Sequence, residues 1–145
     1  YGTIAQNLRL ARPTATEEEL YWAARQAAVL DDILAMPEGF NTRISDSSAG
    51  YLPTSLQQRL NLARGYLKQA PVLLLDEPGN GLDFESDKAF MATLEQMRGQ
   101  VTVFIVTHRP SHLRLADKVS WLDAGQIRGI GPAEEVMKHM PKDFL

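Results

Sequence analysis

Cysteine is absent from this chain of 145 residues, which excludes disulfides, thiolate nucleophiles and cysteine-bound zinc. The three histidines, His108, His112 and His139, lack the close spacing of a helical zinc site. No apolar run approaches the roughly 20 residues that a membrane-spanning helix needs. These absences point away from disulfide-stapled, zinc-binding and membrane-spanning folds.

An excess of basic charge is also missing. Fifteen Lys and Arg against 18 Asp and Glu give a net charge of −3, with both signs interspersed. Such a chain has no basic field to attract nucleic acid, and we expect no nucleic-acid partner. An apolar content of 44% and a charged content of 23% are ordinary for one soluble globular domain. The chain begins without Met or a signal-peptide pattern, from which we expect a piece of a longer protein.

The first part of the sequence carries helix signals. Thr3 can cap a short helix over residues 4–10. Thr16 and Glu19 have capping-box spacing, and the apolar residues that follow predict a single helix within residues 14–34. Residues 35–55 are rich in Gly, Pro, Ser and Asn, which predicts a surface loop.

Buried strands then alternate with helices. A helix over residues 55–68 ends before Pro71. Residues 72–75 and 101–106 are nearly continuous runs of β-branched or aliphatic residues, typical of parallel strands covered on both faces.

Three further elements complete this pattern. Asp83 can cap a helix over residues 84–98, and Ser111 can cap another over residues 112–116. The remaining signals predict a hairpin of residues 118–122 and 126–130, followed by a helix that Pro132 opens.

Acidic side chains stand directly after the first apolar strand. Asp76 and Glu77 occupy its C-terminal end, where open α/β sheets bind ligands. One carboxylate can hold Mg²⁺ or its waters, and the other can orient or deprotonate an attacking water. An acidic pair alone is also common where a strand simply meets solvent, and by itself it favours that interpretation.

A second polar cluster, Thr107-His108-Arg109, follows the second strand. Parallel strands end at the same edge of a sheet, so we expect this cluster beside Asp76 and Glu77. A histidine there can donate to a γ-phosphate or to the attacking water. The two clusters together favour a phosphate site.

At this point the sequence resembles a known family. "VLLLDEP", "GNGLD" and "VFIVTHRPSHLRLADKVSWLDAGQIRGIGPAEEV" closely resemble the second half of an ATP-binding cassette of the ABC transporter superfamily. The opening "GTIAQNLRL" is similar to the segment after the glutamine loop of exporter cassettes, particularly of type I secretion systems. The resemblance implies an α/β fold of the P-loop NTPase type. It places a helical subdomain at residues 1–70, and a partly parallel sheet with flanking helices and a C-terminal β-hairpin at residues 71–145.

The resemblance also implies roles for four side chains. Asp76 matches the Walker B aspartate that holds the Mg²⁺ shell, and Glu77 matches the catalytic glutamate, the general base. Asp83 matches the D-loop aspartate that communicates across a cassette dimer, and His108 matches the switch histidine. The implied cofactors are ATP and Mg²⁺.

The signature position departs from the family. Exporter cassettes carry Leu-Ser-Gly-Gly-Gln, which presents a hydroxyl, glycine amides and a helix N-terminus to the γ-phosphate held by a partner subunit. Leu52 keeps its place here, and Pro53, Thr54, Ser55 and Leu56 replace the other four. Thr54 or Ser55 can still cap the helix and permit weak phosphate binding. The loss of the signature's serine hydroxyl and glycines favours instead a degenerate signature face, which would spoil the ATP site that it shares with the partner subunit. Such a face suits an asymmetric heterodimer with one competent site.

Two other departures concern coupling and nucleotide binding. Ser47 stands where the family has a glutamate, which weakens the expected coupling to transmembrane domains. No G-x-x-x-x-G-K-[ST] loop occurs in the chain, so we expect this piece by itself neither to bind nor to hydrolyse ATP. In the family the P-loop strand lies between the strands that resemble residues 101–106 and 118–122. We therefore expect a gap in the sheet that closes by rearrangement or drives dimerisation.

Three functions remain open. The first is part of an ABC exporter ATPase at the cytoplasmic face of the cell (inner) membrane. Its expected partners are a second cassette subunit, in a homo- or heterodimer, and the transmembrane domains of the same transporter. The second is a non-hydrolysing structural or regulatory cassette, and the third a soluble ABC ATPase of DNA maintenance. Glu77 and His108 favour the first, and the altered signature favours the second. The segment "GTIAQNLRL" and the absence of a basic field argue against the third.

Overall fold

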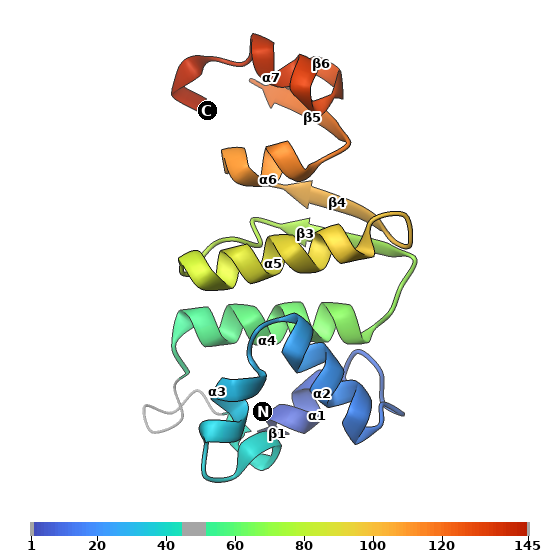
Figure 1. Ribbon diagram of the computed structural model, residues 1–145, viewed down its shortest axis with the longest axis vertical. Helices are drawn as coiled ribbons and strands as arrows, with labels where there is room; N and C mark the ends of the chain where they lie inside the picture. Colours follow the sequence, from blue (N-terminus) through green and yellow to red (C-terminus); the bar gives the residue numbers. More distant parts are fainter. Residues whose placement is uncertain (1, 45–51, 145) are drawn as a thin grey trace.

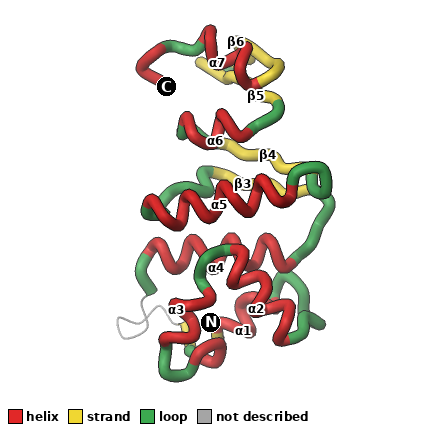
Figure 2. Tube along the Cα trace, in the orientation of Figure 1, coloured by secondary structure: helices red, strands yellow, loops and turns green. Residues whose placement is uncertain are grey.

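The computed structural model describes residues 2–44 and 52–144, and its elements form an elongated stack (Figure 1). The N-terminal helices occupy one end, and the last hairpin and helix occupy the other. More of the described chain is helix than strand (Figure 2). The helices are α1 (Ile4–Arg9), α2 (Glu17–Gln26), α3 (Leu30–Ala35), α4 (Thr54–Leu67), α5 (Phe84–Met97), α6 (Pro110–Leu115) and α7 (Ala133–His139). The strands are β1 (Gly2–Thr3), β2 (Arg43–Ile44), β3 (Val72–Asp76), β4 (Thr102–Val106), β5 (Lys118–Asp123) and β6 (Gln126–Pro132).

The helix predicted within residues 14–34 is two helices, so that prediction is wrong. Thr16 caps α2 through the expected capping box, but α2 ends at Gln26. Ala28 has φ 54, a left-handed conformation that no α-helix continues through. The Val29 amide donates back to the Ala24 carbonyl at 2.9 Å, which closes the chain into a helix-ending turn. Arg59 of α4 donates to the Ala28 carbonyl at 2.6 Å and holds this turn against α4.

One predicted helix cap is also wrong, and the alternative in which Thr54 or Ser55 caps α4 is not observed. Helix α6 begins at Pro110, with Arg109 rather than Ser111 as its N-cap, because the proline ring fixes φ for a first helical turn. The N-cap of α4 is Pro53, and no side chain caps this helix within the described residues. The cap of α5 is confirmed, because the Asp83 carboxylate accepts from the Ser86 amide at 2.8 Å.

The main hydrophobic core joins the N-terminal helices to α4, α5 and one face of β3 and β4. It includes buried residues on both sides of residue 70, such as Leu67 and Phe90. The boundary between residues 1–70 and 71–145 therefore stays a prediction. A smaller cluster holds the C-terminal end together and consists of Leu113, Val119, Ala133, Val136 and Met140.

Strands β3 and β4 pair in parallel, with Asp76 opposite Val106. They were predicted to be covered on both faces, and this is wrong for the described residues. Leu73 and Leu75 pack against the main core, but on the other face Leu74 is 73% exposed. Within residues 2–44 and 52–144, helices cover only one face of this pair.

Strands β5 and β6 form the predicted antiparallel hairpin. Ala124 and Gly125 both have positive φ, 47 and 74, as a tight hairpin turn requires. Within the described residues β4 and β5 belong to different two-stranded sheets, so the expected gap is present and the chain does not close it. Dimerisation through the gap stays a prediction. The described helices include none with the length and hydropathy to cross a membrane.

Candidate functional site

The two polar clusters predicted to share a sheet edge do so. Because β3 and β4 are parallel and in register, Asp76 and Val106 end side by side. The Glu77 amide donates to the Val106 carbonyl at 2.8 Å, which extends the ladder by one residue. Glu77 and His108 therefore leave the two strands at neighbouring points.

The carboxylate and the imidazole meet directly. Nδ1 of His108 lies 3.0 Å from Oε1 of Glu77. The Glu77 side chain is 30% exposed and the His108 side chain 65% exposed, so solvent or a ligand can reach both. Glu77 has φ 43, a left-handed conformation that costs a residue other than glycine about 1–2 kcal/mol. Backbone strain of this kind concentrates at functional sites.

Asp76 stands exposed at the end of β3, beside this pair. Within residues 2–44 and 52–144 no three His, Asp or Glu side chains gather closely enough to hold a metal by themselves. A single exposed carboxylate fits Mg²⁺, which uses one or two carboxylates and completes its shell with water and phosphate oxygens. Asp76 is therefore a suitable ligand for a metal that arrives with a phosphate.

Asp83 lies in the loop between β3 and α5. The Ser86 amide and hydroxyl donate to its carboxylate and lower the pKa of Asp83 below its ordinary value. Nearby, Gly81 has φ 78, and a Cβ added there would lie 3.0 Å from Cγ2 of Thr54. The loop with Asp83 thus passes close to the start of α4.

The start of α4 is attached to the turn after β3. The Gln58 amide donates to the Pro78 carbonyl at 3.1 Å. Thr54 is the exposed first residue of the helix. Oγ of Ser55 is buried and has no hydrogen-bond partner within the described residues, so the hydroxyl faces the interior. Ser47 lies outside the described residues.

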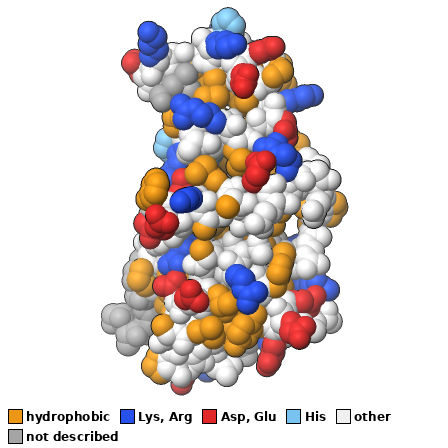
Figure 3. Space-filling view, in the orientation of Figure 1, with side chains coloured by type: hydrophobic (Ala, Val, Ile, Leu, Met, Phe, Trp, Pro, Cys, Tyr) orange, Lys and Arg blue, Asp and Glu red, His pale blue; other side chains and the backbone are white. Residues whose placement is uncertain are grey.

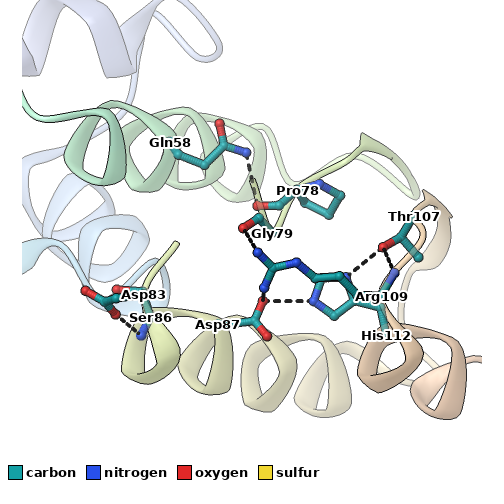
Figure 4. Close-up of polar contacts among 9 residues, drawn as sticks. All are labelled: Gln58, Pro78, Gly79, Asp83, Ser86, Asp87, Thr107, Arg109 and His112. Atoms are coloured by element: carbon teal, nitrogen blue, oxygen red, sulfur yellow. Dashed lines mark hydrogen bonds and ion pairs between the residues drawn. The ribbon is translucent and has the colours of Figure 1, made fainter. Parts of the chain in front are cut away.

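Sequence reasoning missed a partly buried polar cluster next to the Glu77–His108 pair, in which Asp87 and His112 are buried. It joins Asp87, Thr107, Arg109 and His112 beneath the turn at Gly79 (Figure 4). No motif predicts it. One feature of the sequence could have indicated it: Asp87 is an acid one turn before the buried Phe90, on the same face of the helix. Elsewhere the visible surface mixes both charge signs (Figure 3).

Comparisons with known proteins give a consistent result, although no family model matches the chain. The "Beta-(1-->2)glucan export ATP-binding/permease protein NdvA" of Agrobacterium vitis is 37% identical over 134 residues, which are 92% of this chain and 23% of that protein. The "Probable ABC transporter ATP-binding/permease protein" of Haemophilus influenzae is 35% identical over 125 residues, 86% of this chain and 22% of that protein. The chain thus spans less than a quarter of these relatives.

The fold agrees with these relatives. A solved structure of a bacterial Atm1-family ABC exporter with ATP bound matches with a TM-score of 0.85 and 28% identity. The match covers 94% of this chain and 24% of the exporter chain. With the Glu77–His108 pair at the strand ends, the sequence and the fold assign this chain to the ATP-binding cassettes of the ABC exporter family.

Proposed function

We propose that this chain is part of the ATP-hydrolysing domain of an ABC exporter that drives transmembrane transport. The observation that carries the proposal is the contact between Glu77 and His108 at the ends of two parallel strands, beside Asp76. Phosphoryl transfer to water needs a water-positioning or basic group, a metal ligand and a donor toward the phosphate. These three side chains supply one candidate for each.

The residues divide the work by their chemistry. Asp76 would hold Mg²⁺, which would neutralise the phosphates of bound ATP. The Nδ1–H of His108 donates to Oε1 of Glu77, which leaves Oε2 of Glu77 to take a proton from the attacking water. With Nδ1 so engaged, Nε2 of His108 donates to a phosphate oxygen when the imidazole is protonated.

The start of α4 supports an unequal pair of sites. In a cassette dimer this segment would face the nucleotide of a second cassette subunit, and Thr54 and the amides of the first helical turn would meet the phosphates. Pro53 offers neither an amide nor a hydroxyl, and the Ser55 hydroxyl faces inward. We propose a heterodimer in which this chain contributes Glu77 and His108 to one site and a weak signature to the other. We also propose that the transmembrane domains of the same exporter are partners of this chain, and that it lies at the cytoplasmic face of the inner membrane.

A second candidate is a non-hydrolysing cassette that serves as a structural or regulatory subunit. The buried Ser55 hydroxyl and the proline at the α4 N-cap favour it. It differs from the first candidate in one respect, which is that Glu77 performs no chemistry.

The variant Glu77→Gln in the complete transporter distinguishes the two candidate functions. We expect turnover to fall by about 100-fold or more with ATP still bound, because the amide cannot accept the proton. The matched control is Glu134→Gln, the same change on the exposed face of α7. ATPase assays and nucleotide retention provide the measurements. Unchanged turnover in Glu77→Gln would remove Glu77 as the base and support the regulatory cassette.

A further inference from the structure

The partly buried polar cluster next to the candidate site is built around His112. The His112 side chain has no exposed surface, and Nε2 lies 2.8 Å from Oδ1 of Asp87. Its other nitrogen, Nδ1, lies 3.2 Å from Oγ1 of Thr107 (Figure 4). Arg109 adds a second contact to Oδ1 of Asp87, at 3.3 Å. Both ring nitrogens are thus engaged, as burial of a polar ring requires.

The partners determine which nitrogen carries the proton. An ionised Asp87 only accepts, so Nε2–H of a neutral His112 donates to it. Nδ1 then accepts from the Thr107 hydroxyl, and Thr107 Oγ1 in turn accepts from the Arg109 amide at 3.1 Å. Each donor in this series of hydrogen bonds has one acceptor. The series runs from the Arg109 amide through Thr107 and His112 to Asp87, and every group in it is paired.

The cluster holds both sides of the candidate site. Thr107 and Arg109 are the two neighbours of His108 in the chain, and both belong to the cluster. The Arg109 guanidinium also donates to the Gly79 carbonyl at 2.7 Å, two residues after Glu77. A Cβ at Gly79 would lie 2.8 Å from Cε1 of His112, so the turn after Glu77 is packed directly on the ring.

The order Thr107–His112–Asp87 resembles a nucleophile, base and acid, but it does not form a catalytic relay. A substrate cannot reach His112, whose side chain is fully buried. In addition, Thr107 Oγ1 is already engaged by the Arg109 amide. What the cluster can do is fix the backbone on which Glu77 and His108 stand.

We propose that His112 is a positioning residue which, through Thr107 and Asp87, holds His108 and Glu77 in register for ATP hydrolysis. The role in hydrolysis rests on the proposed function. The arrangement itself does not, and can be measured in the 145-residue chain.

The first measurement is the tautomer of His112, from two-dimensional nitrogen–proton NMR of its ring in this chain. We expect the neutral ring with the proton on Nε2. A proton on Nδ1 would overturn the proposal, because Thr107 could then no longer donate to the ring.

The second measurement compares three variants by amide hydrogen exchange. His112→Asn keeps an acceptor near Nδ1 for Thr107, His112→Gln keeps a donor near Nε2 for Asp87, and His112→Phe keeps only ring volume. We expect exchange of the Arg109 amide, relative to a core amide such as that of Leu67, to be about 3- to 10-fold faster in the Gln and Phe variants than in the Asn variant. If exchange changes equally at both amides, His112 is merely structural and the proposal fails. Should His112→Phe not fold, the Asn and Gln variants carry the comparison.

The third measurement uses the complete transporter. We expect His112→Gln to lower kcat about 10- to 100-fold with little change in KM, and His112→Asn to restore most of the rate. An unchanged kcat in His112→Gln would overturn the role in hydrolysis. If Glu77→Gln also leaves turnover unchanged, it is the proposed function that fails, and the NMR and exchange results still decide whether His112 holds the two strand ends.

Discussion

Gly79 shows how a single residue is constrained by the cluster beneath it. Its backbone needs no left-handed conformation, so a larger residue is not excluded by φ. The constraint is space, because an added Cβ would lie 2.7 Å from Nε of Arg109 and 2.8 Å from Cε1 of His112. Both atoms belong to side chains held by hydrogen bonds and cannot move freely.

Gly79→Ala should therefore destabilise the chain by about 1–3 kcal/mol, the usual cost of overpacking. Gly65→Ala is the matched control, since its Cβ would meet only Cδ1 of Leu73 at 3.6 Å. Within α4 that change should stabilise by about 0.5–1 kcal/mol. Urea unfolding measures both. If Gly79→Ala had the same free energy of unfolding as Gly65→Ala, the side chains of Arg109 and His112 would move aside easily, and the expected overpacking would be wrong.

At the scale of elements, α5 depends on its cap. The Ser86 amide stabilises the ionised form of Asp83 and lowers its pKa in the folded chain. A carboxyl group with a lowered folded pKa stabilises the fold above its unfolded pKa, and this contribution is lost as the pH falls through the folded pKa. The pH window lies at and below the ordinary value of 3.8.

Asp83→Ser tests this linkage, because serine can cap the helix without titrating. We expect the stability advantage of the original chain over Asp83→Ser to be full at pH 7 and to shrink as the pH falls below about 4. Unfolding free energies measured by urea from pH 7 to pH 3 provide the comparison. Parallel profiles for the two chains would contradict the role assigned to the Asp83 carboxylate.

The break between α2 and α3 is the second feature at this scale. Ala28 has φ 54, where glycine is free of the penalty of about 1–2 kcal/mol that alanine carries. Ala28→Gly should stabilise the chain by up to about 1 kcal/mol, since the greater freedom of unfolded glycine offsets part of the gain. Ala27→Gly is the control and should destabilise by about 1 kcal/mol, because Ala27 has φ −89 and is buried. A destabilised Ala28→Gly, measured by urea unfolding, would show that the turn is not strained.

At the scale of the whole molecule, the outer face of β3 and β4 is the notable surface. Four large apolar side chains are exposed on it: Val72 at 48%, Leu74 at 73%, Phe104 at 60% and Val106 at 63%. Burying one such side chain stabilises a protein by about 1.5–3 kcal/mol. An exposed apolar face beside strand edges that no other described strand pairs with favours association.

We expect the 145-residue chain to self-associate through this face. The double variant Leu74→Lys with Phe104→Lys should stay monomeric at concentrations where the original chain dimerises. Leu10→Lys is the control, since Leu10 is 71% exposed but lies at the end of α1, away from the sheet. Sedimentation velocity over a range of concentrations measures the difference. A monomeric original chain would refute self-association through this face.

Much of the fold could be predicted from local signals. The capping box of Thr16, the cap of Asp83 and the parallel aliphatic runs all correspond to observed elements. The exceptions have physical reasons. Ala28 occupies a turn where glycine is usual, so the sequence gives no stop signal there. Helix α6 starts at Pro110, two residues before the start that the Ser111 cap predicts.

By itself the sequence determined the family, the position of Asp76 and Glu77 at one strand end and of His108 at the other, and the departure at residues 53–56. These follow from short-range patterns and from the rule that parallel strands end together. Only the tertiary structure decided that Glu77 and His108 touch, that Ser55 faces inward, and that His112 joins Asp87 to Thr107. These contacts join residues up to 31 positions apart, and side-chain direction and packing, which local patterns do not encode, determine which of them form.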